Sequence, residues 1–240
     1  MDKIKLRTIS IDSACTIFWE PGCDPKVPWI PVEKVLREIN NFLNSLGYNV
    51  KEYSSYWSLY QSLWEDLWKR GPQRELWHRY VLAKYLYKIG VKADHKLLDR
   101  VYELFIELRA KWFTMPSNHR WVLKQLKGKG YKIILTTGTG AHDLVLKILE
   151  LNDATHLFDF VFSTQLVGIP KNDPRFYMEL LDLLDIDSDM IIHIGDSIRY
   201  DIDPASKAGL PTIYYGWRSQ CRATDPQPCI KDLSELIYLL

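Results

Sequence analysis

Two acidic residues, Asp196 and Asp201, follow a run of apolar residues from Met190 to Ile194. A buried strand over this run would deliver both carboxylates into the turn that comes after it. Carboxylates held so close together repel each other unless a cation joins them, and hard oxygen ligands favour magnesium over softer metals. We therefore predict a divalent-metal site at Asp196 and Asp201.

A third carboxylate stands near the start of the chain. Residues Lys5 to Asp12 alternate polar and apolar side chains, which predicts a strand that ends at Asp12. An aspartate at the carboxyl end of a strand can act as a nucleophile. Asp12 is therefore our candidate nucleophile.

Two further segments have the composition of a phosphate site. Residues 132–140 predict a short apolar strand that ends in hydroxyls and glycines, and hydroxyls with free backbone N–H groups at a strand–helix junction suit phosphate oxygens. Lys171 stands just before a helix start marked by Pro174, where its charge could screen an aspartate and an anionic substrate.

These four segments, in this order, resemble the four motifs of the haloacid dehalogenase superfamily, whose members are mostly magnesium-dependent phosphohydrolases. The resemblance covers the chain outside residues 21 to about 115. It implies an aspartyl-phosphate intermediate and a small phosphorylated substrate. The roles that it implies are the nucleophile for Asp12, the catalytic phosphate-binding hydroxyl for Thr136, substrate binding for Thr137 and Gly138, the third-motif lysine for Lys171, and metal binding for Asp196 and Asp201.

The chain departs from the family pattern at Ala14. Family phosphatases usually carry a second aspartate there, two positions after the nucleophile, which protonates the departing alcohol and then activates water. Losing such a positioned acid–base group lowers the rate by roughly 100-fold to 10,000-fold. Magnesium binding survives the change, because the family uses the main-chain carbonyl at this position, so the implied Mg²⁺ ligands are Asp12, Ala14, Asp196 and Asp201.

Three hypotheses follow from Ala14. The first is a phosphatase that is slow, that acts on phosphates with good leaving groups, or that borrows an acid from a mobile cap. The second is a hydrolase of carbon–phosphorus bonds similar to phosphonoacetaldehyde hydrolase, which also has alanine there and uses a cap lysine, for which Lys51 is the candidate. The third is a non-catalytic binding protein with the same fold. We favour the first, because keeping several buried charges without a ligand is costly. Dehalogenation is less favoured still, since the dehalogenases of the family do not need magnesium.

Composition excludes several other classes of protein. The 31 basic and 30 acidic side chains give a formal charge of +1, so nothing indicates a nucleic acid or an anionic membrane surface as partner. No apolar run approaches the roughly 18 residues that a membrane span requires. The first residues lead into a strand rather than a signal peptide, so we expect a cytoplasmic enzyme.

The four cysteines are too few for a disulfide scaffold and lack the close pairs of a structural zinc site. We expect Cys15 to be a small packed side chain. Cys221 and Cys229 flank a proline-rich loop and could form a bridge, a possibility that the sequence leaves open.

From Ser117 onward, helical and strand patterns alternate, which predicts an α/β fold with a doubly wound parallel sheet and ligands at the carboxyl ends of its strands. Between the first two motifs, apolar residues recur every three or four positions and predict helices. We therefore predict a core domain of residues 1–20 and 116–240 and an inserted helical cap of residues 21–115. Its aromatic residues would mainly pack inside the cap, and any exposed remainder could form a homodimer contact.

Overall fold

The computed structural model describes residues 7–24, 26, 30–70 and 77–240. Within these residues the sheet has six strands in the order β3-β2-β1-β4-β5-β6, and all neighbouring strands are parallel. This confirms the predicted α/β fold, although residues 5 and 6 of the first predicted strand lie outside the described residues. The strands are β1 (Thr8–Asp12), β2 (Lys132–Thr137), β3 (Phe160–Ser163), β4 (Ile191–Gly195), β5 (Thr212–Tyr215) and β6 (Cys229–Ile230).

The three central strands bring the predicted site together. All residues of β1 and β4 are buried, as expected for strands of a parallel sheet that is covered on both faces. In the register of the sheet, Asp12 stands opposite Thr136 of β2, and Ile11 stands opposite Ile194 of β4. Strand β1 lies where the strand order reverses, so the carboxyl ends of β1, β2 and β4 form the crevice in which ligands of such sheets bind.

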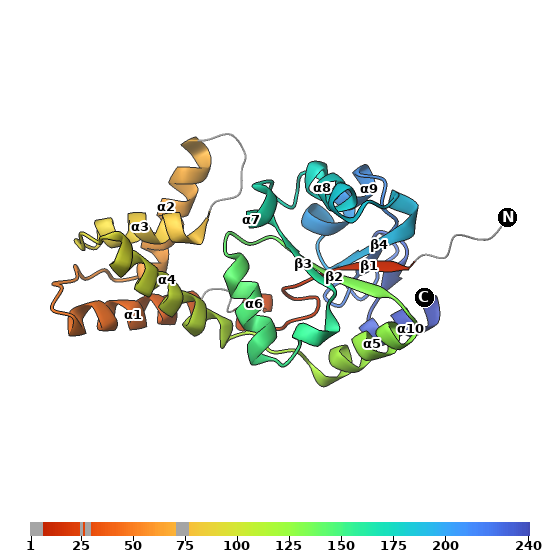
Figure 1. Ribbon diagram of the computed structural model, residues 1–240, viewed down its shortest axis with the longest axis horizontal. Helices are drawn as coiled ribbons and strands as arrows, with labels where there is room; N and C mark the ends of the chain where they lie inside the picture. Colours follow the sequence, from red (N-terminus) through yellow and green to blue (C-terminus); the bar gives the residue numbers. More distant parts are fainter. Residues whose placement is uncertain (1–6, 25, 27–29, 71–76) are drawn as a thin grey trace.

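Helices cover both faces of the sheet (Figure 1). Helices α8 and α9 lie on one face, where Phe176, Tyr177 and Leu180 are fully buried. Helices α5 and α6 lie on the other face. The helices of this part are α5 (Ser117–Gly128), α6 (His142–Leu151), α7 (Thr164–Val167), α8 (Pro174–Leu184), α9 (Asp203–Lys207) and α10 (Leu236–Leu239), with short 3-10 turns at Thr155–Leu157, Ser188–Met190 and Leu233–Glu235.

Four helices from the predicted cap region lie together beside the sheet (Figure 1). They are α1 (Ile30–Ser45), α2 (Tyr56–Arg70), α3 (His78–Lys88) and α4 (His95–Ala110), and a 3-10 turn at Pro21–Cys23 precedes them. Some of their aromatic residues pack inward as the spacing predicts, since Tyr56, Tyr60, Tyr85 and Phe105 are buried, whereas Tyr80 and Tyr87 of α3 are exposed. The domain boundaries at residues 20/21 and 115/116 stay a prediction. Among the described helices, none combines the length and the apolar character that crossing a membrane requires.

The segment after β4 differs from the single helix predicted over residues 199–208. A π-helix at Ile198–Ile202 comes first, closed by a backbone hydrogen bond of 3.1 Å from the Ile202 N–H to the Ser197 carbonyl, and α9 follows it. π-Helical turns of this kind often occur at functional sites. Here the wide turn directs Asp201 back toward the end of β4, where its Oδ2 accepts a hydrogen bond of 2.9 Å from the Ser197 N–H.

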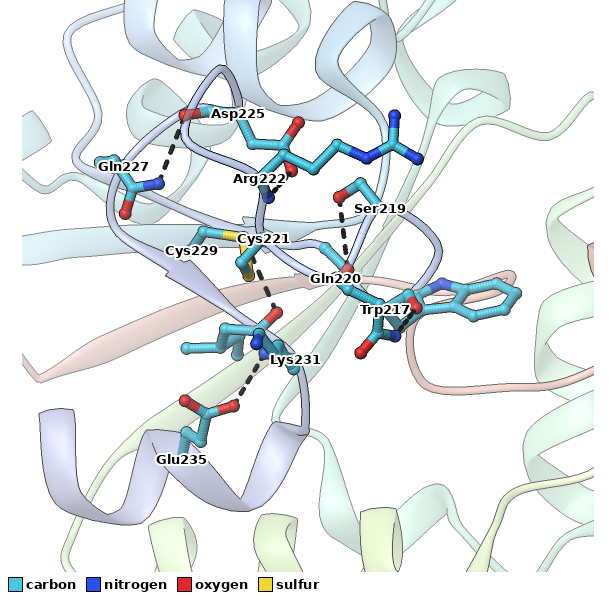
Figure 2. Close-up of a disulfide and its surroundings, with 12 residues drawn as sticks. Trp217, Ser219, Gln220, Cys221, Arg222, Asp225, Gln227, Cys229, Lys231 and Glu235 are labelled. Atoms are coloured by element: carbon cyan, nitrogen blue, oxygen red, sulfur yellow. Dashed lines mark hydrogen bonds between the residues drawn. A yellow bond between two sulfur atoms is a disulfide. The ribbon is translucent and has the colours of Figure 1, made fainter.

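All four cysteines form disulfides, Cys15 with Cys23 and Cys221 with Cys229. The first of these bridges was not predicted from the sequence, and the turn after β1 brings Cys23 back beside Cys15 to form it. Figure 2 shows the second bridge, which joins the start of a surface loop to β6. Gly216 leaves room for this bridge, since a β-carbon there would lie 2.6 Å from Cys229 Sγ.

Candidate active site

A cavity of about 660 Å³ lies at the carboxyl ends of β1, β2 and β4. Asp12 comes from the end of β1, Asp196 and Asp201 follow β4, and Lys171 precedes α8. Segments up to 189 residues apart in the sequence thus meet in one cavity, as the sequence predicts. The other lining residues include Ala14, Thr137, Gly138, Asn172 and Arg199 from the sheet side and Trp64, Glu65 and Lys69 from α2.

Three carboxylates converge in this cavity. Asp12, Asp196 and Asp201 each place an oxygen within 4.8 Å of the other two. Asp12 and Asp201 are buried, with 8% and 1% of their surface exposed. Buried carboxylate oxygens at this separation form a donor set suited to a hard divalent cation such as Mg²⁺. The residues present therefore fit the predicted metal.

Lys171 neutralises part of this negative charge. Its Nζ lies 2.6 Å from Asp201 Oδ1 and also contacts Asp12 Oδ1, and the residue is only 4% exposed. Burial by itself lowers the pKa of a lysine, but the two carboxylates outweigh it and raise the pKa of Lys171 above its usual value. Lys171 is therefore a buried, charged ammonium group shared by two aspartates.

The carboxylates differ in acidity. Burial raises the pKa of Asp12 to about 7, with Asp201 and Asp196 adding to the effect and Lys171 opposing it. Burial also acts on Asp201, but Lys171 and the neighbouring His193 prevail and lower its pKa to about 2. The pKa of Asp196 is raised, mainly by burial and by Asp201. Lys171 contacts Asp12 and Asp201, and a divalent cation among the three carboxylates would further reduce their mutual repulsion.

A buried polar network, whose other members do not line the cavity, contacts Asp201. His193 Nε2 lies 3.2 Å from Asp201 Oδ1 and 3.1 Å from the Tyr177 hydroxyl, and Nδ1 of the same ring lies 2.8 Å from Ser10 Oγ. Sequence reasoning missed these residues. The available signal was the presence of a serine and a histidine inside two fully buried strands, where polar groups need partners.

Gly195 is a position at which only glycine leaves space for Asp201. A β-carbon there would lie 2.3 Å from Asp201 Cγ, and Asp201 is buried and cannot move aside freely. We expect Gly195→Ala to displace Asp201 and to lower the free energy of unfolding by roughly 1 to 3 kcal/mol, the range for overpacked interiors. Unfolding in urea measures this loss of free energy. Gly128→Ala in α5 is the control, since its β-carbon would meet nothing within 4 Å. Equal stability of the two variants would contradict the prediction.

The two threonines at the end of β2 are placed differently. Thr136 is completely buried, its hydroxyl lies 3.2 Å from the Ile11 carbonyl, to which it donates, and it accepts a hydrogen bond from Ser10 Oγ. Thr136 is not among the residues that line the cavity, whereas Thr137 and Gly138 are. Successive side chains of a strand point to opposite faces, so the two neighbours cannot share one role.

Arg218 is a cavity neighbour that sequence reasoning did not identify. Its Nη1 lies 2.5 Å from Asp196 Oδ2, and its Nη2 donates a hydrogen bond of 3.1 Å to the Cys23 carbonyl. It follows Asp196 by 22 residues in an irregular loop, and no local pattern marks it. The guanidinium therefore shares Asp196 with any metal that binds there.

Lys51, the candidate lysine of the phosphonate hypothesis, lies elsewhere. It is exposed, its Nζ is 5.4 Å from the centre of the Tyr53 ring, and it lines neither this cavity nor the adjoining one described below. The hypothesis therefore loses the lysine that it named.

Comparisons with solved structures agree with the fold. The chain superposes on a 2-haloacid dehalogenase from Pseudomonas syringae with a TM-score of 0.74 at 20% identity, covering 98% of both chains. It superposes on the hydrolase YfnB from Bacillus subtilis, solved with bound magnesium, with a TM-score of 0.62 at 17% identity, again covering 98% of both chains. At such identities the likeness shows a common fold.

Sequence relatives include two named phosphatases. Phosphoglycolate phosphatase of Psychrobacter arcticus is 30% identical over 123 residues, which are 49% of this chain and 53% of that protein. Glyceraldehyde 3-phosphate phosphatase of Methanopyrus kandleri is 23% identical over 128 residues, 53% and 54% of the two chains. The haloacid dehalogenase-like hydrolase domain-containing protein 3 of Mus musculus is 36% identical over 140 residues, 57% and 54% of the two chains. The chain thus spans about half the length of these relatives.

A family model adds the decisive match. The model described as haloacid dehalogenase-like hydrolase matches residues 73–215, which contain Thr137, Lys171, Asp196 and Asp201. This range is more than half of the chain. The match, the parallel sheet and the carboxylate cluster at its carboxyl edge agree, and the chain belongs to the haloacid dehalogenase-like hydrolase family.

Proposed function

We propose that this protein is a magnesium-dependent phosphatase that acts on a small phosphorylated molecule through an aspartyl-phosphate on Asp12. The observation that carries the proposal is the position of Asp12, whose carboxylate lies in a cavity together with two further carboxylates and a buried, charged lysine. The names of two relatives, phosphoglycolate phosphatase and glyceraldehyde 3-phosphate phosphatase, support the same class of reaction.

Several residues of the cavity have roles in the proposed reaction. Asp12 attacks the phosphorus atom in line with the departing oxygen. Lys171, the Thr137 hydroxyl and the backbone N–H of Gly138 stabilise the negative charge that develops on the phosphoryl oxygens. We assign the hydroxyl role to Thr137, because Thr136 is hydrogen bonded inside the sheet.

Magnesium, when held by Asp12, the Ala14 carbonyl and Asp196 with support from Asp201, would supply positive charge that neutralises the phosphoryl group. Lys171 contacts Asp12 through one oxygen, Oδ1, which leaves Oδ2 of the same carboxylate for a second cation. Water then attacks the aspartyl-phosphate and frees both phosphate and Asp12.

Ala14 lines the cavity but offers only a methyl group and backbone atoms. We expect Ala14→Asp to raise turnover of an alkyl phosphate by about tenfold or more, and that of an aryl phosphate less, since a positioned acid assists poor leaving groups most. Initial rates on benzyl phosphate and 4-nitrophenyl phosphate measure the two gains. Ala14→Asn, of similar size but unable to donate a carboxyl proton, is the control. Equal gains on both substrates would contradict the prediction.

A screen of phosphorylated small molecules, run with and without magnesium, tests the proposed function. Phosphate release that depends on both magnesium and Asp12 supports it. Magnesium binding without turnover of any compound would instead support the non-catalytic hypothesis.

A further inference from the structure

A second cavity, of about 430 Å³, adjoins the one that contains Asp12. It lies between the sheet side and the helices α1, α2 and α4, and its lining is mainly apolar. Characteristic residues are Tyr60, Phe105, Phe113, Leu144 and Ile148. Because the phosphoryl group must lie beside Asp12, this apolar neighbour is the space for the organic part of the substrate, an assignment that rests on the proposed phosphatase function.

The bond that breaks joins these two parts of the substrate. Its ester oxygen must therefore lie where the two cavities meet. Among the residues that the structure describes, those that line both cavities are Ala14, Trp64, Glu65, Thr137 and Gly138. Among these five residues, Glu65 alone has an ionisable side chain.

We propose that Glu65 of α2 is the general acid and base of this enzyme and replaces the aspartate that is absent at position 14. As the P–O ester bond breaks, the Glu65 carboxyl gives its proton to the departing oxygen, which leaves as an alcohol, while Asp12 forms the new bond to phosphorus. The Glu65 carboxylate then takes a proton from water as that water attacks phosphorus. The P–O bond to Asp12 breaks, and phosphate and the starting enzyme remain.

Glu65 is exposed on α2 and lines both cavities, and neighbouring contacts position this stretch of the helix. Gln61, one turn earlier on α2, donates a hydrogen bond of 3.1 Å to Glu65 Oε1. The ring of Trp64 packs against that of His78 at 5.1 Å between centroids. The backbone N–H of His78 donates a hydrogen bond of 2.9 Å to the carbonyl of Gly140, in the loop after β2. This stretch of α2 is thereby connected, through His78, to the loop that begins at Gly138 after β2.

Other titratable groups of the second cavity are less suitable. His78 is buried with its pKa lowered to about 4, and its Nδ1 is 2.8 Å from the Tyr60 hydroxyl, so it is neutral and already paired. Glu20 is bound in a largely buried ion pair with Arg109. Neither residue lines the cavity of Asp12.

Glu65→Gln tests the proposal, because the substitution keeps the size of the side chain and removes its proton transfer. We expect kcat for benzyl phosphate to fall by roughly 100-fold to 10,000-fold. With 4-nitrophenyl phosphate, whose leaving group needs no proton, Asp12 should still react at nearly the normal rate while hydrolysis of the aspartyl-phosphate becomes slow. Rapid mixing should then show a burst of 4-nitrophenol close to one equivalent per enzyme. Adding Ala14→Asp to Glu65→Gln should restore turnover by a larger factor than Ala14→Asp gives in the wild-type protein.

Asp66→Asn is the matched control, since Asp66 is the next residue on α2, is exposed and lines neither cavity. A parallel loss on both substrates without a burst would show that Glu65 has a structural role and would overturn the proposal. Unchanged kinetics in Glu65→Gln, with turnover still dependent on Asp12, would overturn it as well and leave the phosphatase function standing. Absence of turnover of both substrates by the wild-type protein would overturn both.

Discussion

Asp12→Asn is expected to lower kcat by about 10,000-fold or more, as loss of a covalent nucleophile does in other enzymes. Asparagine has nearly the same shape as aspartate and can still accept a hydrogen bond from Lys171, so the fold and the cavity are retained. The amide is a poor nucleophile toward phosphorus. Magnesium-dependent phosphate release measures the effect. A variant that keeps this release would remove Asp12 from the role of nucleophile.

The thermal stability of Asp12→Asn shows whether the variant keeps its fold. This comparison must allow for the ionisation of Asp12, which makes the stability of the wild-type protein depend on pH. Asp12 has a pKa of about 7 in the folded protein against an ordinary value of 3.8, so the unfolded chain releases this proton more readily. The folded state is therefore favoured at acid pH and loses stability as pH rises from about 4 to about 7. Asparagine cannot ionise, so Asp12→Asn without metal should have a melting temperature at pH 8 equal to or above that of the wild type. A clear decrease would indicate a disturbed fold, and the loss of turnover would then not identify a nucleophile.

Lys171→Met is expected to lower the free energy of unfolding by about 3 to 5 kcal/mol without a divalent cation, the range for removal of one partner from a buried ion pair. Methionine fills the space of the lysine stem but leaves Asp12 and Asp201 without their shared ammonium group. The raised pKa of Lys171 agrees with this expectation, because the folded state favours the charged ammonium group. The resulting stability is complete below the ordinary pKa of lysine and is lost as the pH rises through the raised pKa.

Urea unfolding of Lys171→Met with and without magnesium separates charge from packing. A bound cation compensates part of the lost positive charge, so magnesium should stabilise the variant by more than it stabilises the wild-type protein. Lys124→Met on α5 is the matched control, because Lys124 is exposed and its replacement should leave stability nearly unchanged. Equal stability of the two variants in metal-free buffer would show that the buried contacts of Lys171 carry little energy.

The sequence alone determined the α/β fold and the meeting of Asp12, Lys171, Asp196 and Asp201. These features depend on patterns within short segments: apolar runs form buried strands, and the residue after each run must emerge at the carboxyl edge. Once the strands are parallel, all such residues share one edge of the sheet. The wide π-helical turn that returns Asp201 to this edge had no such pattern, yet the spacing from Asp196 still indicated a common site.

Tertiary structure decided what depends on contacts between distant segments. Thr136 and Thr137 are equivalent in a local pattern, and only the register of β2 against β1 turns one hydroxyl into the sheet and places the other at the cavity. The pairing of Cys15 with Cys23 required the turn after β1. Glu65 reaches the cavity from α2, and Arg218 reaches Asp196 from a late loop. Folding sets both positions, and no spacing along the chain encodes them.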